Sequence, residues 1–146
     1  MKVKAALLLA LLSGICTIAQ TRIEAADGFR YITTTIDYPI TGTYYFNGAE
    51  PTVELYAGGN GYYQLHEQPK RAVNWGIECD ESGVPIFKKG FDNLAYTLWY
   101  QYTTATEFDD GTNLSWKSVG FTIHFNSQKM FIQGERCKTY SGKAQR

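Results

Sequence analysis

The sequence predicts an all-β protein that folds as an antiparallel up-and-down barrel of eight or nine strands. After residue 19, Tyr, Thr, Val, Ile, Phe and Trp dominate, and these β-branched and aromatic residues favour strands. No window in that part of the chain repeats apolar residues at helical spacing for more than one turn. Short apolar segments instead alternate with turns rich in glycine and asparagine, which is typical of antiparallel sheets.

The candidate strands follow one another as a meander. The turn at 58–61 contains three glycines, which adopt positive φ angles readily, so the strands on either side of it are expected to form a hairpin. Further hairpins are expected around 81–83 and 126–128. The predicted strands are 29–37, 42–48, 52–57, 62–67, 72–80, 84–89, 95–104, 114–125 and 129–140.

A flat sheet of this many strands would expose two unpaired edges, and closure into a barrel removes both. At about eight strands, a closed barrel has room for its own side chains or for one small ligand. A sandwich of two sheets is the alternative architecture.

Side chains alternate between the two faces of a strand, so the apolar set in each segment marks its inner face. The predicted inner positions are Tyr44, Phe46, Val53, Leu55, Val73, Trp75, Ile77, Val119, Phe121, Ile123 and Phe125. One further strand carries a hydroxyl-rich face made of Tyr96, Leu98, Tyr100 and Tyr102. If that face points inward, a wet or ligand-occupied interior would satisfy it, because an unmatched buried hydroxyl costs about 1 to 3 kcal/mol.

The first nineteen residues have the order of a secretory signal peptide. Lys2 and Lys4 precede an apolar run at 5–12, and small residues follow. We expect cleavage after Ala19, with a cut near residues 25–26 as the alternative.

Cleavage after Ala19 divides the chain into a signal peptide, 1–19, and a single β-barrel domain, 20–146. The apolar run is too short to cross a bilayer, so we expect no transmembrane segment and a secreted or periplasmic location. Lipid attachment at Cys16 is the alternative, but Ile15 occupies a position that should be small in a lipoprotein signal.

Charge and cysteine content limit the function classes further. The mature chain would carry 12 Lys and Arg against 14 Asp and Glu, so it lacks the basic surface that a nucleic-acid partner requires. Its two cysteines, Cys79 and Cys137, match no metal motif. In an oxidising compartment they form one disulfide or stay as buried free thiols, and both outcomes are open.

Two short motifs connect these features to a known family. Gly42-Thr43-Tyr44 opens a strand, and Gly134-Glu135-Arg136 stands near the end of the last one. With the leader and the meander, they make the chain resemble the lipocalin and wider calycin group, in particular the small lipocalin-like exported proteins of Gram-negative bacteria. In that family Gly-x-Trp begins the first barrel strand, and an arginine of the last strand packs across the tryptophan at the closed end.

The resemblance implies that Tyr44, in place of the tryptophan, and Arg136 close one end of the barrel. It also implies a lumen that often holds a small apolar molecule. The leading hypothesis is therefore a ligand-binding barrel without a cofactor or catalytic role. The predicted lumen-lining residues are Phe46, Leu55, Trp75, Tyr100 and Phe121.

Catalysis has little support in the sequence. The sequence has no serine in a nucleophile-elbow motif, and His66 and His124 do not have the spacing of a metal-binding pair. We therefore interpret both histidines as surface residues of a non-enzymatic protein. Three carboxylates at Glu107, Asp109 and Asp110 are interpreted as a solvated turn rather than a calcium site.

The alternative function is a surface module that binds another protein, as an inhibitor or immunity-like partner does. It would use outward aromatic side chains and the loop at 104–113. A filled interior favours this alternative, whereas a cavity open at one end favours the ligand-binding barrel.

Overall fold

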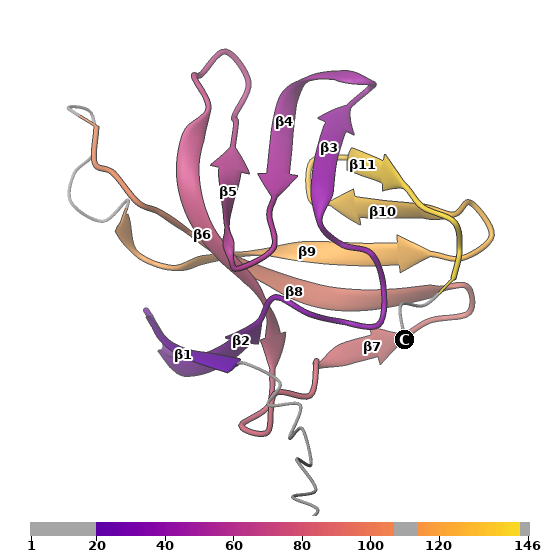
Figure 1. The fold of residues 1–146 in the computed structure, drawn as a ribbon, viewed down its shortest axis with the longest axis horizontal. Coiled ribbons are helices and arrows are strands. Elements are labelled where there is room, and N and C mark those ends of the chain that lie inside the picture. The colour runs from indigo at the N-terminus through magenta and orange to yellow at the C-terminus, as the bar shows by residue number, and fades with distance from the viewer. Residues whose placement is uncertain (1–19, 107–113, 144–146) are drawn as a thin grey trace, which may run out of the picture.

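The computed structural model describes residues 20–106 and 114–143 (Figure 1). The predicted signal peptide, the three carboxylates and most of the predicted binding loop therefore lie outside the described residues. The strands are β1 (Gln20–Ala25), β2 (Gly28–Thr33), β3 (Gly42–Phe46), β4 (Ala49–Leu55), β5 (Asn60–Tyr63), β6 (Arg71–Cys79), β7 (Phe87–Lys89), β8 (Asn93–Tyr102), β9 (Lys117–His124), β10 (Lys129–Ile132) and β11 (Arg136–Thr139).

Eight of these strands form a closed antiparallel barrel, which confirms the predicted fold class. Around the ring the order is β3, β4, β5, β6, β8, β9, β10 and β11. The pairing of β6 with β8, from Val73 opposite Tyr102 to Ile77 opposite Leu98, closes the ring on one side. The pairing of β11 with β3 closes it on the other. Neighbouring strands in the ring follow one another in sequence, except that β7 lies between β6 and β8 in sequence and that β11 pairs with β3 to close the ring. This is the order of an up-and-down barrel.

A hairpin that the sequence does not predict adds to the outside of this barrel. Its first strand, β1, pairs with β2, and the predicted strand 29–37 ends at Thr33. β2 then pairs with the C-terminal part of β6, where Thr33 lies opposite Ile77. β6 therefore belongs to the barrel wall at one end and to the hairpin extension at the other.

The hairpin packs on the barrel wall through a second, smaller core, made of Ile23, Ala25, Ile32 and Trp99 with Trp116 beside it. Gly76 makes this close approach possible, because a Cβ at that position would lie 2.7 Å from the Cβ of Ile32. The indole nitrogen of Trp99 donates a hydrogen bond of 2.8 Å to the Glu78 carboxylate. These contacts bury Trp99 although it points out of the barrel.

β7 does not form the predicted hairpin ladder with β6. A turn does exist at 81–83, but the only pairing between the two segments is a bridge between Cys79 and Pro85 in the described structure. β7 pairs instead with β8, where Phe87 lies opposite Tyr96. β8 pairs with β6 from Val73 to Ile77, so that edge of β6 is already occupied next to Cys79 and the ladder with the 84–86 segment stops at one bridge.

The predicted last strand, 129–140, is in fact two strands. Gly134 and Glu135 have φ angles of 91° and 64°, and this left-handed pair reverses the chain between β10 and β11. β10 pairs with β9, and β11 continues the ring to β3. The reversal supplies the eighth barrel strand.

The predicted inner faces are confirmed except at Phe46, which is partly exposed at the end of β3. Trp75, Phe121 and Tyr44 are among the largest fully buried side chains, and the hydroxyl-rich face of β8 also points inward. Their outward neighbours Tyr45 and Tyr56 are exposed. No helix in the described part of the chain has the length and apolarity needed to cross a membrane.

Candidate functional site

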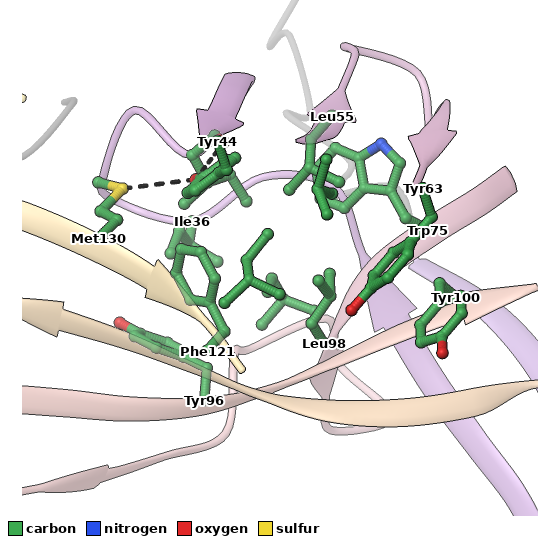
Figure 2. Close-up of a cluster of buried hydrophobic side chains, with 14 of the residues drawn as sticks. Ile36, Tyr44, Leu55, Tyr63, Trp75, Tyr96, Leu98, Tyr100, Phe121 and Met130 are labelled. Atoms are coloured by element: carbon green, nitrogen blue, oxygen red, sulfur yellow. Dashed lines mark hydrogen bonds between the residues drawn. The ribbon is translucent and has the colours of Figure 1, made fainter. Parts of the chain in front are cut away.

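The barrel interior contains four of the five residues predicted to line a lumen. Leu55, Trp75, Tyr100 and Phe121 come from β4, β6, β8 and β9 and belong to one buried cluster. Figure 2 shows these side chains facing one another together with Tyr44 and Leu98, among others. The structure therefore brings them together as mutually packed core residues, and ligand binding at them stays a prediction.

Phe46, the fifth predicted residue, lies apart from that cluster. It ends β3 and is partly exposed, and its ring meets the ring of His66 edge-on with 4.7 Å between the centroids. His66 itself is exposed, as predicted for a surface histidine.

Trp75 has a clear architectural role at the turn between β4 and β5. Its indole nitrogen donates to the carbonyl oxygens of Tyr56 at 3.1 Å and of Asn60 at 2.9 Å. Its own backbone N–H donates to the carbonyl oxygen of Gly59 at 2.8 Å. The side chain thus fixes the glycine-rich turn to the barrel core.

Tyr44 is buried and contacts the segment at 34–41, which leads into β3 at one end of the barrel. Its hydroxyl donates to the carbonyl oxygen of Ile40 at 2.6 Å and approaches the Met130 sulfur at 3.7 Å (Figure 2). Burial raises the pKa of this hydroxyl. Lys138 of the last strand donates to the carbonyl oxygens of Pro39 and Thr41 at 2.5 Å each. The cation that holds this end is therefore Lys138.

Arg136 does not contact the ring of Tyr44 as the family resemblance implies. It begins β11 and lies opposite Phe46, at the other end of β3. Its guanidinium carbon lies 5.3 Å from the ring centroid of Tyr63, so its cation–π contact is with that ring. Because β11 runs antiparallel to β3, its later residue Lys138 is the one that reaches Gly42, where a Cβ would meet the lysine Cε at 2.8 Å.

Arg136 belongs to an aromatic cluster at its end of the barrel. The guanidinium is buried and donates to the carbonyl oxygens of Gln64 at 3.0 Å and Gln133 at 3.3 Å. Its Nε has no hydrogen-bond partner among the described residues. Tyr63 stacks on Tyr100 with 4.5 Å between ring centroids, and burial raises the pKa of both phenols.

A shallow groove of about 1020 Å³ lies on the outer surface of the barrel, over β9, β10 and β11. It is open to solvent along one side and is apolar over most of its lining. We call this concavity the outer groove. Its lining includes Gly120, Thr122, His124, Lys129, Phe131, Gln133, Glu135 and Cys137.

A row of cross-strand neighbours forms the middle of the outer groove. Phe131 on β10 lies opposite Thr122 on β9 and opposite Cys137 on β11. The Phe131 ring also meets the His124 ring edge-on, with centroids 5.3 Å apart. Cys137 in turn lies opposite the exposed Tyr45 on β3, which extends the surface beyond the groove.

Gly120 forms part of the groove floor near the middle of β9. It lies on the outward face, because its neighbours Val119 and Phe121 belong to or pack against the barrel core. A Cβ added at Gly120 would meet nothing within 4 Å, and the φ angle is not in the left-handed region. Neither packing nor backbone geometry therefore requires a glycine here.

The outer groove is not predicted from the sequence, although one signal for it is present. In the alternating segment 117–124, Gly120 is an outward position without a side chain, and an interior strand glycine often marks close approach by another molecule. The concavity itself depends on the reversal between β10 and β11, which the sequence analysis did not predict.

Cys79 and Cys137 do not form the disulfide that was one of the two expected outcomes, and both cysteines are free. β6, with Cys79, and β11, with Cys137, are separated by three strands in either direction around the ring. Neighbouring strands are about 4.8 Å apart, whereas bonded cysteines need Cα atoms within about 7 Å. In addition, Cys137 borders the outer groove. Of the two outcomes that the sequence leaves open, the structure therefore has the free thiols, because the two strands lie on opposite sides of the barrel.

The two thiols are expected to differ in reactivity in the native protein. An alkylating reagent at pH 8 should label Cys137, which lines the groove, and leave Cys79 unlabelled. Burial raises the pKa of the Cys79 thiol to about 11, so little of the reactive thiolate forms. Peptide mass spectrometry after labelling, with a sample unfolded in urea as the control, measures the difference. Equal labelling of both cysteines before unfolding would contradict the structure.

The described residues show no site that could hold a metal ion. Within 20–106 and 114–143, no group of three or more His, Cys, Asp and Glu side chains has a suitable arrangement. His124 is partly buried against Phe131 on the outer face of β9.

Comparison with models of known protein families, with curated protein sequences and with solved structures found no match to this chain.

Proposed function

We propose that this protein is an exported, non-enzymatic binding protein with a lipocalin-like barrel, and that its partner is another protein that docks in the outer groove. The closed eight-stranded barrel supports the lipocalin-like part of this proposal. Recognition is assigned to the outside of the barrel because of how the interior and the groove are built.

The packing of the interior favours recognition at the surface. Leu55, Trp75 and Phe121 are almost completely buried and belong to a cluster with contributions from strands around the ring. Pockets for small molecules usually have volumes of about 300 to 1000 Å³ and enclose most of the ligand. The clefts of about 210 and 220 Å³ beside the segment at 34–41 are smaller than that range, and a cleft of about 330 Å³ lies outside the core, between the β1–β2 hairpin and the turn at 58–59.

The outer groove has the composition of a protein–protein interface. Phe131 provides an apolar aromatic centre, and Lys129 and Glu135 place charges of both signs around it. Thr122 and Gln133 add hydrogen-bonding groups. An apolar centre with a polar rim is the usual anatomy of such interfaces, and aromatic residues are enriched in them. The shallow shape suits a partner surface better than a small ligand.

Gly120 is the observation that carries the proposal. Glycine in a strand interior costs about 0.5 to 1 kcal/mol relative to alanine, because the unfolded chain loses more freedom on folding. Nothing in the fold requires that loss at position 120, where a side chain would project into open space. A partner surface that approaches the strand closely at this position would require a residue without a side chain.

The substitution Gly120→Val is expected to stabilise the protein by about 0.5 to 1 kcal/mol, because valine suits a strand and meets no obstruction here. Urea denaturation measures this change. Gly76→Ala is the matched control in a neighbouring part of the barrel wall, and it should destabilise the protein because its Cβ would clash with Ile32. A destabilised Gly120→Val variant would show that the glycine has a structural role.

Site-specific photo-crosslinking tests the proposed docking surface. A photoreactive phenylalanine analogue at Gln133, in the groove, should form one defined covalent adduct with a partner protein in the native extract. The same analogue at Tyr62, exposed on β5 across the ring from β10, should form none. Gly120→Tyr, which fills the groove, should abolish the adduct, and Thr97→Val on the neighbouring strand should retain it. An adduct that survives Gly120→Tyr would overturn the proposal.

A small, partly apolar molecule bound inside the barrel is the second candidate function. The buried Nε of Arg136, without a partner among the described residues, and the stacked pair Tyr63 and Tyr100 favour it. Native mass spectrometry of the purified protein distinguishes the candidates. A mass excess that is lost on denaturation and is absent in Arg136→Met would support the interior site, and the bare chain mass would support the groove.

A further inference from the structure

The turn into β7 and the turn out of it expose a group of large apolar side chains. Val84 is 52% exposed, Ile86 50% and Phe87 47%, while Phe91 is fully exposed. Isolated exposed apolar residues are ordinary, but here four of them occur within the eight residues 84–91. With Lys88 and Lys89, which lie between them in sequence, they are called the 84–91 patch.

The patch projects at the end of a hairpin. Gly90 N–H donates to the carbonyl oxygen of Asn93 at 2.8 Å, which closes the turn between β7 and β8 and places Phe91 at its tip. β7 is the last strand of the sheet order and pairs only with β8 among the described strands (Figure 1). The Phe87 ring retains an inward contact with Tyr96, with centroids 5.3 Å apart. Phe91, in contrast, is fully exposed, so its side chain could be buried in a partner surface without losing a contact to the barrel core.

The charged side chains within residues 84–91 are both positive, and the acidic Asp37 borders one cleft together with Val84 and Phe87. Lys88 and Lys89 are exposed, and neither takes part in an ion pair within the part of the chain that the structure describes. The nearest acidic residue in sequence, Asp92, is partly buried, and its carboxylate accepts hydrogen bonds of 3.1 and 3.2 Å from the backbone N–H of Asn126. The protruding aromatic side chain is thus accompanied by two lysines.

We propose that the 84–91 patch docks on an anionic lipid surface, with Phe91 inserted into the interface and Lys88 and Lys89 near the headgroups. Aromatic side chains partition into the membrane interface, and each lysine near an anionic surface adds an electrostatic attraction. A second copy of the chain is a poorer occupant, because pairing two short β7 strands would bring lysines of like charge together. The inference is independent of the outer groove, which lies on β9, β10 and β11.

Vesicle co-sedimentation of the mature protein, residues 20–146, tests the inference, because the apolar and basic segment 1–19 would bind vesicles by itself. Binding is expected to vesicles that contain phosphatidylserine, to be weaker with phosphatidylcholine alone, and to fall as salt rises. Phe91→Ser should lower the partition coefficient about tenfold or more, since burial of a phenylalanine contributes more than a tenfold factor. Lys88→Ser with Lys89→Ser should lower it about thirtyfold on anionic vesicles.

Leu65→Ser is the matched control, because Leu65 is 49% exposed and lies in the loop between β5 and β6, at the far end of the barrel from the patch. It should bind vesicles like the wild type. Gly120→Val should do so as well, so the test of lipid binding is independent of the test of the outer groove. Urea denaturation checks that each variant is folded. No binding of the wild type to anionic vesicles at low salt, or equal binding by Phe91→Ser, would overturn the inference. Capture of an acidic protein through the patch without lipid binding would do the same.

Discussion

Replacement of Trp75 by alanine is expected to destabilise the protein by about 3 to 5 kcal/mol, the range for loss of a large aromatic residue from a packed core. The side chain is 1% exposed and belongs to the main buried cluster. Its loss would also leave the carbonyl oxygens of Tyr56 and Asn60 without their indole donor. Urea denaturation measures the change. Because a domain of ordinary stability has about 5 to 15 kcal/mol in total, this loss is at least a fifth of the stability and at most nearly all of it.

Trp75→Phe separates the two contributions at this position. Phenylalanine retains much of the apolar contact but has no N–H, so we expect a smaller loss of about 1 to 3 kcal/mol from the turn carbonyl groups and the reduced volume. If both variants had wild-type stability, the residue would not hold the turn to the core.

Alkaline solution is expected to unfold the protein between about pH 11 and 12. Burial raises the pKa of Tyr96 to about 12, and it raises the pKa values of Tyr44 and Tyr100 as well. Below pH 10 these phenols are protonated in both states, and their effect on stability is constant. Above pH 10 the unfolded chain ionises first, so it binds fewer protons and the folded state loses stability as pH rises.

Each phenol that stays protonated in the folded protein lowers the free energy of unfolding by up to about 1.4 kcal/mol for each pH unit above 10. Solvent screening reduces this value for the less completely buried hydroxyls, and the three together still amount to several kcal/mol at pH 12. Circular dichroism across a pH series follows the unfolding, and tyrosinate absorbance follows the ionisation.

Tyr96→Phe removes one of these ionisations and should move the alkaline midpoint to higher pH. Tyr62→Phe is the control, since Tyr62 is exposed and its removal should leave the midpoint where it is. A protein that remains folded at pH 12 with all of its tyrosines ionised would contradict the burial of these three phenols.

The alternation of side chains predicts the inner faces correctly because a strand has a fixed period of two residues. Trp75 and Phe121 were assigned to the interior by that rule, and tight packing then confirmed it. The rule is local, and it applies wherever one face is buried. It also predicts the closed sheet, because eight segments with one apolar face each can bury those faces together.

Strand pairing depends on geometry that local patterns do not contain. The chain reversal at Gly134 looks like a continuation of one strand in the sequence, so Arg136 was assigned to the wrong partner and Lys138 was overlooked. The two cysteines are natural partners by count, but the ring order puts them on opposite sides. The outer groove combines three strands, and only Gly120 indicated it locally.

The position of β11 also determines when the barrel can form. This last strand lies between β3 and β10. The free edge of β3 is therefore paired only when Cys137, which is far along the chain, comes to lie opposite Tyr45. Such a high contact order requires loop-closure entropy to be overcome early, which slows folding. The ring therefore stays open, with the edges of β3 and β10 unpaired, until the C-terminal segment has been synthesised.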